Sequence, residues 1–209
     1  MAIDASVGWY EDVFATHAIG FRAANGIWSA FRPAPAFHSA LITLQPEITA
    51  DQVRERITDL AWGGPKDSFA SIDGHVLGMR LLFEATWIHR PAEAGASSDA
   101  WTVVTDAGSL AGWNRHAATE GVILPALLER SGIFVLERRE GGRPVAGAVL
   151  RADATAIDLS NVHAVVGTTI GWLAPGRPIV GFERDDDLTA ALDAGWEAVA
   201  ARTVWAPSP

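Results

Sequence analysis

Apolar runs of strand length alternate with turn signals most regularly in the last third of the chain. The predicted strands of this segment are, in order, residues 133–137, 144–150, 156–164, 179–183 and 202–205. The first two flank a loop with two adjacent glycines, which is typical of a β-hairpin. A helix is expected before the last strand, because the three aspartates 185–187 suit a helix N-terminus.

The first hundred residues carry similar signals with less regularity. Amphipathic spacing predicts a helix near residues 9–18, and a capping-box pattern at Thr49 predicts a second helix that ends before Gly63. Further strands are predicted at 39–44, 68–72 and 77–88. Strands and helices of these lengths together predict an α+β protein.

A stretch rich in Gly, Ser and Ala, residues 92–100, is the best candidate for a linker. It divides the chain into an α/β N-terminal extension, residues 1–99, and a second domain, residues 100–209. A strand followed by a helix is predicted on both sides of the linker. Residues 1–99 could therefore be a second, similar half or an extension without a repeat. We expect the two parts to pack through tryptophans, with Trp28, Trp62, Trp87 and Trp101 as the candidates.

The composition limits the classes of partner and the cellular compartment that we expect for this chain. The chain has 209 residues, 49% hydrophobic and 20% charged, which is typical of a globular core. A formal net charge of -9 and a single lysine, Lys66, predict no nucleic-acid partner. The absence of cysteine excludes disulfides and thiolate catalysis, and the histidines lack the spacing of a metal site. No membrane partner is expected, and the expected location is the cytoplasm.

The order of elements from residue 100 onward resembles that of the GNAT N-acetyltransferase superfamily. In that family a strand splays from its neighbour, acyl-CoA lies in the splay, and a motif close to R/Q-x-x-G-x-G/A binds its pyrophosphate. Gly167 and Gly171 agree with common family residues, whereas Val166 replaces Arg or Gln and Thr169 replaces Gly. Pro175 then cuts short the helix that should follow.

The resemblance implies a GNAT-like mixed, mainly antiparallel sheet flanked by helices, with acetyl-CoA or another acyl-CoA as co-substrate. The residues it assigns to the acyl-CoA are Asn161, Val162, His163, Ala164, Gly167, Thr168, Thr169 and Gly171. Because a charge and part of a helix dipole are missing from the loop, we expect binding to be about ten- to several-hundredfold weaker than in an intact motif.

Two residues are candidate catalytic bases. Glu183 ends a predicted strand where the ligands of such sheets bind, and it could accept a proton from an amine. Its structural alternative is an ion pair with Arg184 or another surface arginine. His163 is the second candidate, and its alternative is a half-buried histidine bonded to neighbouring backbone. The family often uses a tyrosine near the late helix as acid, but the one tyrosine, Tyr10, lies far away in sequence.

Three functions follow from these observations. The first is a GNAT-type acyltransferase that moves an acyl group from acyl-CoA to the amine of a small-molecule or protein acceptor. The second is a GNAT-fold protein without catalytic activity that binds a small molecule or a partner. The third is an unrelated α+β enzyme or binding domain. The partners expected are a small-molecule amine and a second copy of the chain in a homodimer.

Overall fold

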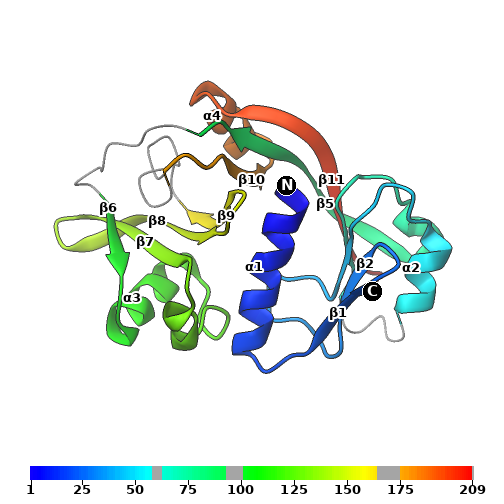
Figure 1. Cartoon of the computed structure of the whole chain (residues 1–209), viewed down its shortest axis with the longest axis horizontal. Coiled ribbons are helices and arrows are strands. Elements are labelled where there is room, and N and C mark those ends of the chain that lie inside the picture. The colour runs from blue at the N-terminus through cyan, green and yellow to red at the C-terminus, as the bar shows by residue number, and fades with distance from the viewer. Residues whose placement is uncertain (58–62, 93–100, 164–174, 209) are drawn as a thin grey trace.

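The computed structural model of the chain describes residues 1–57, 63–92, 101–163 and 175–208. One eleven-stranded sheet runs through it (Figure 1). In spatial order its strands are β1 (Phe21–Ala24), β2 (Ile27–Ala30), β3 (Leu41–Thr43), β4 (Pro65–Asp67), β11 (Glu197–Pro207), β5 (Met79–Arg90), β10 (Ile179–Glu183), β9 (Ile157–His163), β8 (Arg143–Ala152), β7 (Ile133–Glu140) and β6 (Trp101–Val104). The helices are α1 (Ala2–Thr16), α2 (Ala50–Arg56), α3 (Ala107–Ala117) and α4 (Asp185–Asp193), with the 3₁₀ turns η2 (Gly74–Leu77) and η3 (Pro125–Glu129).

The sheet is mixed and mainly antiparallel, which confirms the predicted fold class. Only two of its pairings in the described chain are parallel, β3 with β4 and β9 with β10. The hairpin of β7 and β8 turns at Gly141 and Gly142, whose φ angles of 56° and 80° favour glycine.

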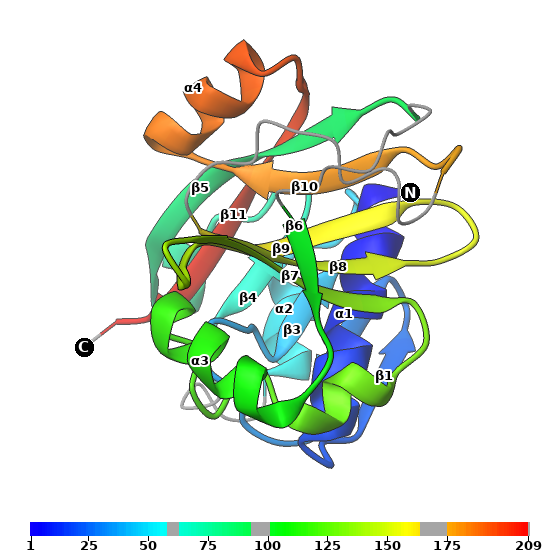
Figure 2. The same cartoon turned by 90° about the vertical axis from the view of Figure 1, so that its left-hand side faces the viewer.

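Neighbouring residues of the strands point to opposite faces, and each face has its own core. Val135 and Val149 pack with α1, α3 and η3, whereas Leu136 and Leu150 pack with α4 on the other face. Figure 2 shows α3 and α4 on opposite sides of these strands. The sheet is therefore covered on both faces in its second half.

The two central strands interlock the halves of the chain. β5 comes from the first half but lies between β10 and β11, where Trp87 is opposite Phe182. β11 comes from the second half and also pairs with β4, where Val204 is opposite Lys66. The last strand of the chain, β11, therefore lies between two strands of the first half, β4 and β5.

Helix α1 begins at Ala2, earlier than the sequence pattern predicted, and contacts β8, β9, β10 and η3. Trp9, Val13 and Phe14 are buried on its inner face, and Phe14 stacks edge-on against Trp28. Of the predicted packing tryptophans, Trp28, Trp87 and Trp101 are buried, and Trp62 lies outside the described residues.

The strand predicted at 68–72 is wrong. The strand β4 ends at Asp67, and the chain then turns. The Asp67 carboxylate causes this turn, because it accepts hydrogen bonds from the backbone N–H groups of Phe69, Ser71 and Ile72. Those three amides therefore donate to the Asp67 side chain and not to the backbone of a neighbouring strand.

Candidate functional site

The parallel strands β9 and β10 separate soon after they meet. Ile157 is opposite Ile179 and Asp158 is opposite Val180, and no further pairing between the two strands follows among the described residues. β9 also has a bulge where it pairs with β8. Ser160 is opposite Val149 and His163 is opposite Gly147, so β9 has one extra residue between these two pairs. Asn161 lies in this bulge with a φ of 50°. The strands thus open as a V, as the resemblance implied.

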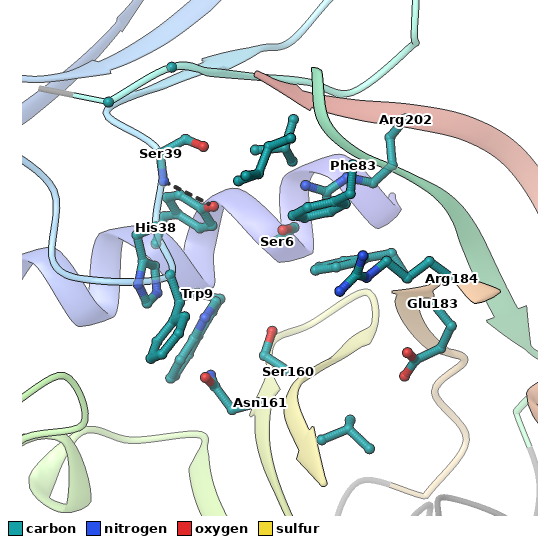
Figure 3. A pocket seen from close by; sticks show the side chains of 18 of the residues that line it. Ser6, Trp9, His38, Ser39, Phe83, Ser160, Asn161, Glu183, Arg184 and Arg202 are labelled. Carbon is teal, nitrogen blue, oxygen red and sulfur yellow. Dashed lines mark hydrogen bonds between the residues drawn. The ribbon is translucent and has the colours of Figure 1, made fainter. Parts of the chain in front are cut away.

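A cavity of about 590 Å³ lies beside this opening. Its walls come from the N-terminal helix α1, the loop at 37–39, the ends of β9 and β10, and the central strands β5 and β11 (Figure 3). Segments from both ends of the chain therefore build one cavity.

The structure brings together about half of the predicted site residues. Asn161, Val162, His163 and Glu183 all line the cavity. Ala164, Gly167, Thr168, Thr169 and Gly171 lie outside the described residues, and so do Val166 and the rest of the predicted pyrophosphate loop.

Glu183 is the last residue of β10 and points into the cavity (Figure 3). Burial raises the pKa of its carboxyl from the ordinary 4.5 to about 7, and the nearby Asp187 carboxylate adds to the shift. The alternative ion pair with Arg184 does not form, since Arg184 pairs with Asp185 at 3.5 Å and lies over the Phe83 ring. Glu183 is therefore partly ionised near neutral pH, which suits a general base.

His163 lies under helix α3. Its ring centroid is 4.7 Å from that of His116 and 5.3 Å from that of Trp113. Neither ring nitrogen has a hydrogen-bond partner in the described part of the chain. Burial lowers the pKa of His163, and His116 lowers it further, so the ring is neutral at pH 7. The backbone of Asn161 partly offsets this shift by raising the pKa of the ring, so the alternative of a histidine satisfied by neighbouring backbone stays open.

Tyr10 was set aside in the sequence because of its distance along the chain, but the fold brings it to the cavity. Helix α1 places it in the wall of the cavity, where its hydroxyl accepts a 3.4 Å hydrogen bond from the Ser39 N–H. Burial raises the pKa of the phenol, so it stays protonated at neutral pH. The sequence signal was present in the apolar stripe of the first helix, which puts this face against the sheet.

Two buried cations, Lys66 and Arg202, were also missed. The Lys66 ammonium group donates a 2.6 Å hydrogen bond to Ser6 Oγ and lies 4.7 Å from the Tyr10 ring centroid. The Arg202 guanidinium lines the cavity and lies 3.8 Å from the Phe182 ring centroid. Each is only 1% exposed. For Arg202 the signal was a charge at the start of the predicted strand 202–205, whereas Lys66, beside Asp67 in β4, gave no such signal.

No helix in the described part of the chain is long and apolar enough to cross a membrane. Across those same residues, no three His, Asp or Glu side chains gather as a metal-binding group.

Comparison with known proteins assigns the fold. The sequence matches no protein-family model and no curated protein. A GCN5-related N-acetyltransferase from Kribbella flavida matches with a TM-score of 0.62 at 13% identity, over 100% of this chain and 97% of that chain. A putative GNAT-family acetyltransferase from Novosphingobium aromaticivorans matches with a TM-score of 0.57 at 12% identity, over 96% and 97%. The chain has the GNAT fold.

A third match is named without an activity. It is a functionally unknown conserved protein from Staphylococcus epidermidis, with a TM-score of 0.62 at 12% identity, over 91% of this chain and 95% of that chain. At such identities the GNAT fold is shared, whereas the chemistry has to be argued from the cavity itself.

Proposed function

We propose that the protein is an acyltransferase that moves an acyl group from acyl-CoA to the amine of an acceptor. The observation that carries this proposal is the opening between β9 and β10 together with Glu183, whose pKa is raised to about 7 at the end of β10. The GNAT fold supplies the precedent for acyl-CoA in such an opening.

The opened strand β9 fits the extended part of an acyl-CoA. Beyond Asp158 its inner edge does not pair with β10 among the described residues, so its backbone groups face the opening. An extended ligand with amide groups can bind such an edge as an added strand would. Asn161 and Val162 line the cavity at this point and would hold the donor.

Two side chains have the protonation states that the reaction needs. The acyl thioester supplies an activated carbonyl carbon, to which the amine nitrogen bonds as the carbon–sulfur bond breaks. Glu183 accepts the proton that the amine loses. Tyr10, protonated at neutral pH, is the candidate donor to the departing thiolate. His163 lines the same cavity and is the second candidate base.

A GNAT-fold protein without catalytic activity is the second candidate. Val166 and Thr169 stand where the family motif has a polar or positively charged residue and a glycine. This difference favours weak donor binding, and it makes a direct activity measurement decisive between the two functions.

Release of CoA from acetyl-CoA in the presence of amines tests the proposal. We expect a slow wild-type rate that rises with pH through about 7, because the Glu183 carboxyl must be ionised to act as base. Glu183→Gln should lower the rate by about 10²- to 10⁴-fold. Glu47→Gln, on an exposed loop, is the matched control and should leave it unchanged. Equal rates for wild type and Glu183→Gln would exclude Glu183 as the base.

A further inference from the structure

The most unusual group in the cavity is the guanidinium of Arg202. The side chain is 1% exposed, yet its Nε and Nη1 have no hydrogen-bond partner in the described chain. Its planar faces are occupied by rings, with centroids of Phe182 at 3.8 Å and Trp87 at 5.0 Å. A buried charged donor without a partner is costly, so a fold normally pairs it or uses it to bind a ligand.

The carboxylates nearest to Arg202 are committed elsewhere. Asp67 accepts hydrogen bonds from Thr43 and from the three backbone amides of its own turn. Asp158 accepts a 2.6 Å hydrogen bond from Ser160. Among the described residues neither carboxylate lies within ion-pair distance of Arg202, so its planar edge is left for another anion.

The Asp67 and Asp158 carboxylates are near enough to act on Arg202, but neither forms an ion pair with it in the described chain. Burial raises the pKa of Asp158 and lowers the pKa of Lys66, which moves both groups toward their neutral forms. Burial lowers the pKa of Arg202 to about 10, so the guanidinium stays positive at neutral pH. The unpaired guanidinium can therefore bind an anion at the inner end of the cavity.

The rest of the cavity has a carboxylate and aromatic side chains. Glu183, at the end of β10, is a carboxylate that suits an ammonium group. Trp9, Phe83 and Phe182 add aromatic surface between the two charged regions. Arg184 also lines the cavity, but it is paired with Asp185. A ligand with a carboxylate, an amine and an apolar body matches all three features.

We propose that Arg202 binds the carboxylate of the acyl acceptor, which makes the acceptor a small amino-acid-like molecule rather than a simple amine. A guanidinium binds a carboxylate through two parallel hydrogen bonds, either from Nε and Nη2 or from Nη1 and Nη2, and each of the two unpartnered nitrogens belongs to one of these edges. This inference rests on the proposed acyl transfer for the role of the ligand as acceptor, but the binding site itself can be tested without a donor.

Calorimetric titration of the full chain without CoA is the test. L-phenylalanine is compared with 2-phenylethylamine, which lacks the carboxylate, and L-leucine with 3-methylbutylamine. We expect each amino acid to bind about 10- to 100-fold more tightly than its matched amine, as a charge-assisted hydrogen bond provides. In Arg202→Met that preference should disappear, and in Arg22→Met, at an exposed site on β1, it should persist.

Folding of the variant is checked by its melting temperature. Arg202→Met replaces a buried, unpartnered charge by an apolar side chain, so its melting temperature should equal or exceed that of wild type. If it does not fold, Arg202→Lys replaces it, because lysine keeps the charge but loses the paired donors and should still bind the amino acids more weakly. The wild-type comparison of amino acid with amine needs no variant.

Acetyl-CoA is titrated into the same proteins to separate two sources of the anion. Unchanged acetyl-CoA binding in Arg202→Met supports a carboxylate of the acceptor, whereas its selective loss would assign Arg202 to a phosphate of the donor. Equal binding of amine and amino acid by wild type, or binding of neither, would overturn the inference. Arg202-dependent amino-acid binding without any acetyl-CoA binding would refute acyl transfer and leave the carboxylate site intact.

Discussion

Burial controls the ionisable side chains around the cavity. It raises the pKa of Glu183 to about 7 and lowers that of His38 to about 4. Glu183 could be predicted from the sequence, because its place at a strand end is a local property. The burial of Tyr10 follows from the apolar stripe of the first helix, but its place beside Arg202 of the last strand could not be predicted. Only the packing of elements distant in sequence brings the two residues to one cavity.

The raised pKa of Glu183 predicts a pH-dependent stability. The folded carboxyl, with a pKa of about 7, keeps a proton that the unfolded carboxyl, with the ordinary value of 4.5, releases earlier. The free energy of unfolding should therefore fall as pH rises from about 4.5 to 7. Glu183→Gln lacks this ionisation, so it should match wild type at pH 5 and melt at a higher temperature than wild type at pH 8.

Thermal melts of both proteins at the two pH values check this sign. Glu47→Gln serves again as control and should show the same melting temperature as wild type at each pH. A Glu183→Gln effect that is identical at pH 5 and pH 8 would contradict the burial of this carboxyl.

At the scale of the element, the bulge in β9 shapes the opening. The sequence predicted the strand from its apolar run but not the bulge, because a bulge is defined by the register against β8. Asn161 adopts the left-handed region with a φ of 50°. Asparagine reaches this region more easily than most residues, whereas a β-branched residue there is strained.

Substitution at Asn161 tests the bulge. Asn161→Val should cost about 1–2 kcal/mol of stability, because the left-handed conformation is unfavourable for valine. Asn161→Gly removes the same side chain but tolerates the conformation, so its stability should stay close to that of wild type. Urea denaturation measures both free energies of unfolding. Equal stability of the valine and glycine variants would argue against a left-handed residue at this position.

At the scale of the molecule, the two halves of the chain share their central strands. The sequence indicated a boundary near residue 100, and the division into an extension and a second domain stays a proposal. Local patterns could not show that β5 lies between β10 and β11, since strand partners distant in sequence leave no periodic signal. The first half of the chain also contains a parallel pair, β3 and β4, as a second, similar half would.

Expression of residues 100–209 alone tests this interlocking. The fragment lacks β5, so the facing edges of β10 and β11 lose their partner and Trp87 no longer covers Phe182. We expect an aggregating product without a cooperative thermal transition. Co-expression with residues 1–99 should restore solubility. A soluble fragment with a cooperative melt would show instead that the second part folds independently.

The central claim, that the opening between β9 and β10 holds acyl-CoA, is tested most directly by titrating acetyl-CoA into ¹⁵N-labelled protein. Backbone amide signals report both affinity and position. We predict saturable shifts with a dissociation constant in the high micromolar range, largest at Ser160, Asn161 and Val162, because these residues form the open edge and wall. No saturable shift at millimolar acetyl-CoA, or the largest shifts away from this opening, would contradict the account.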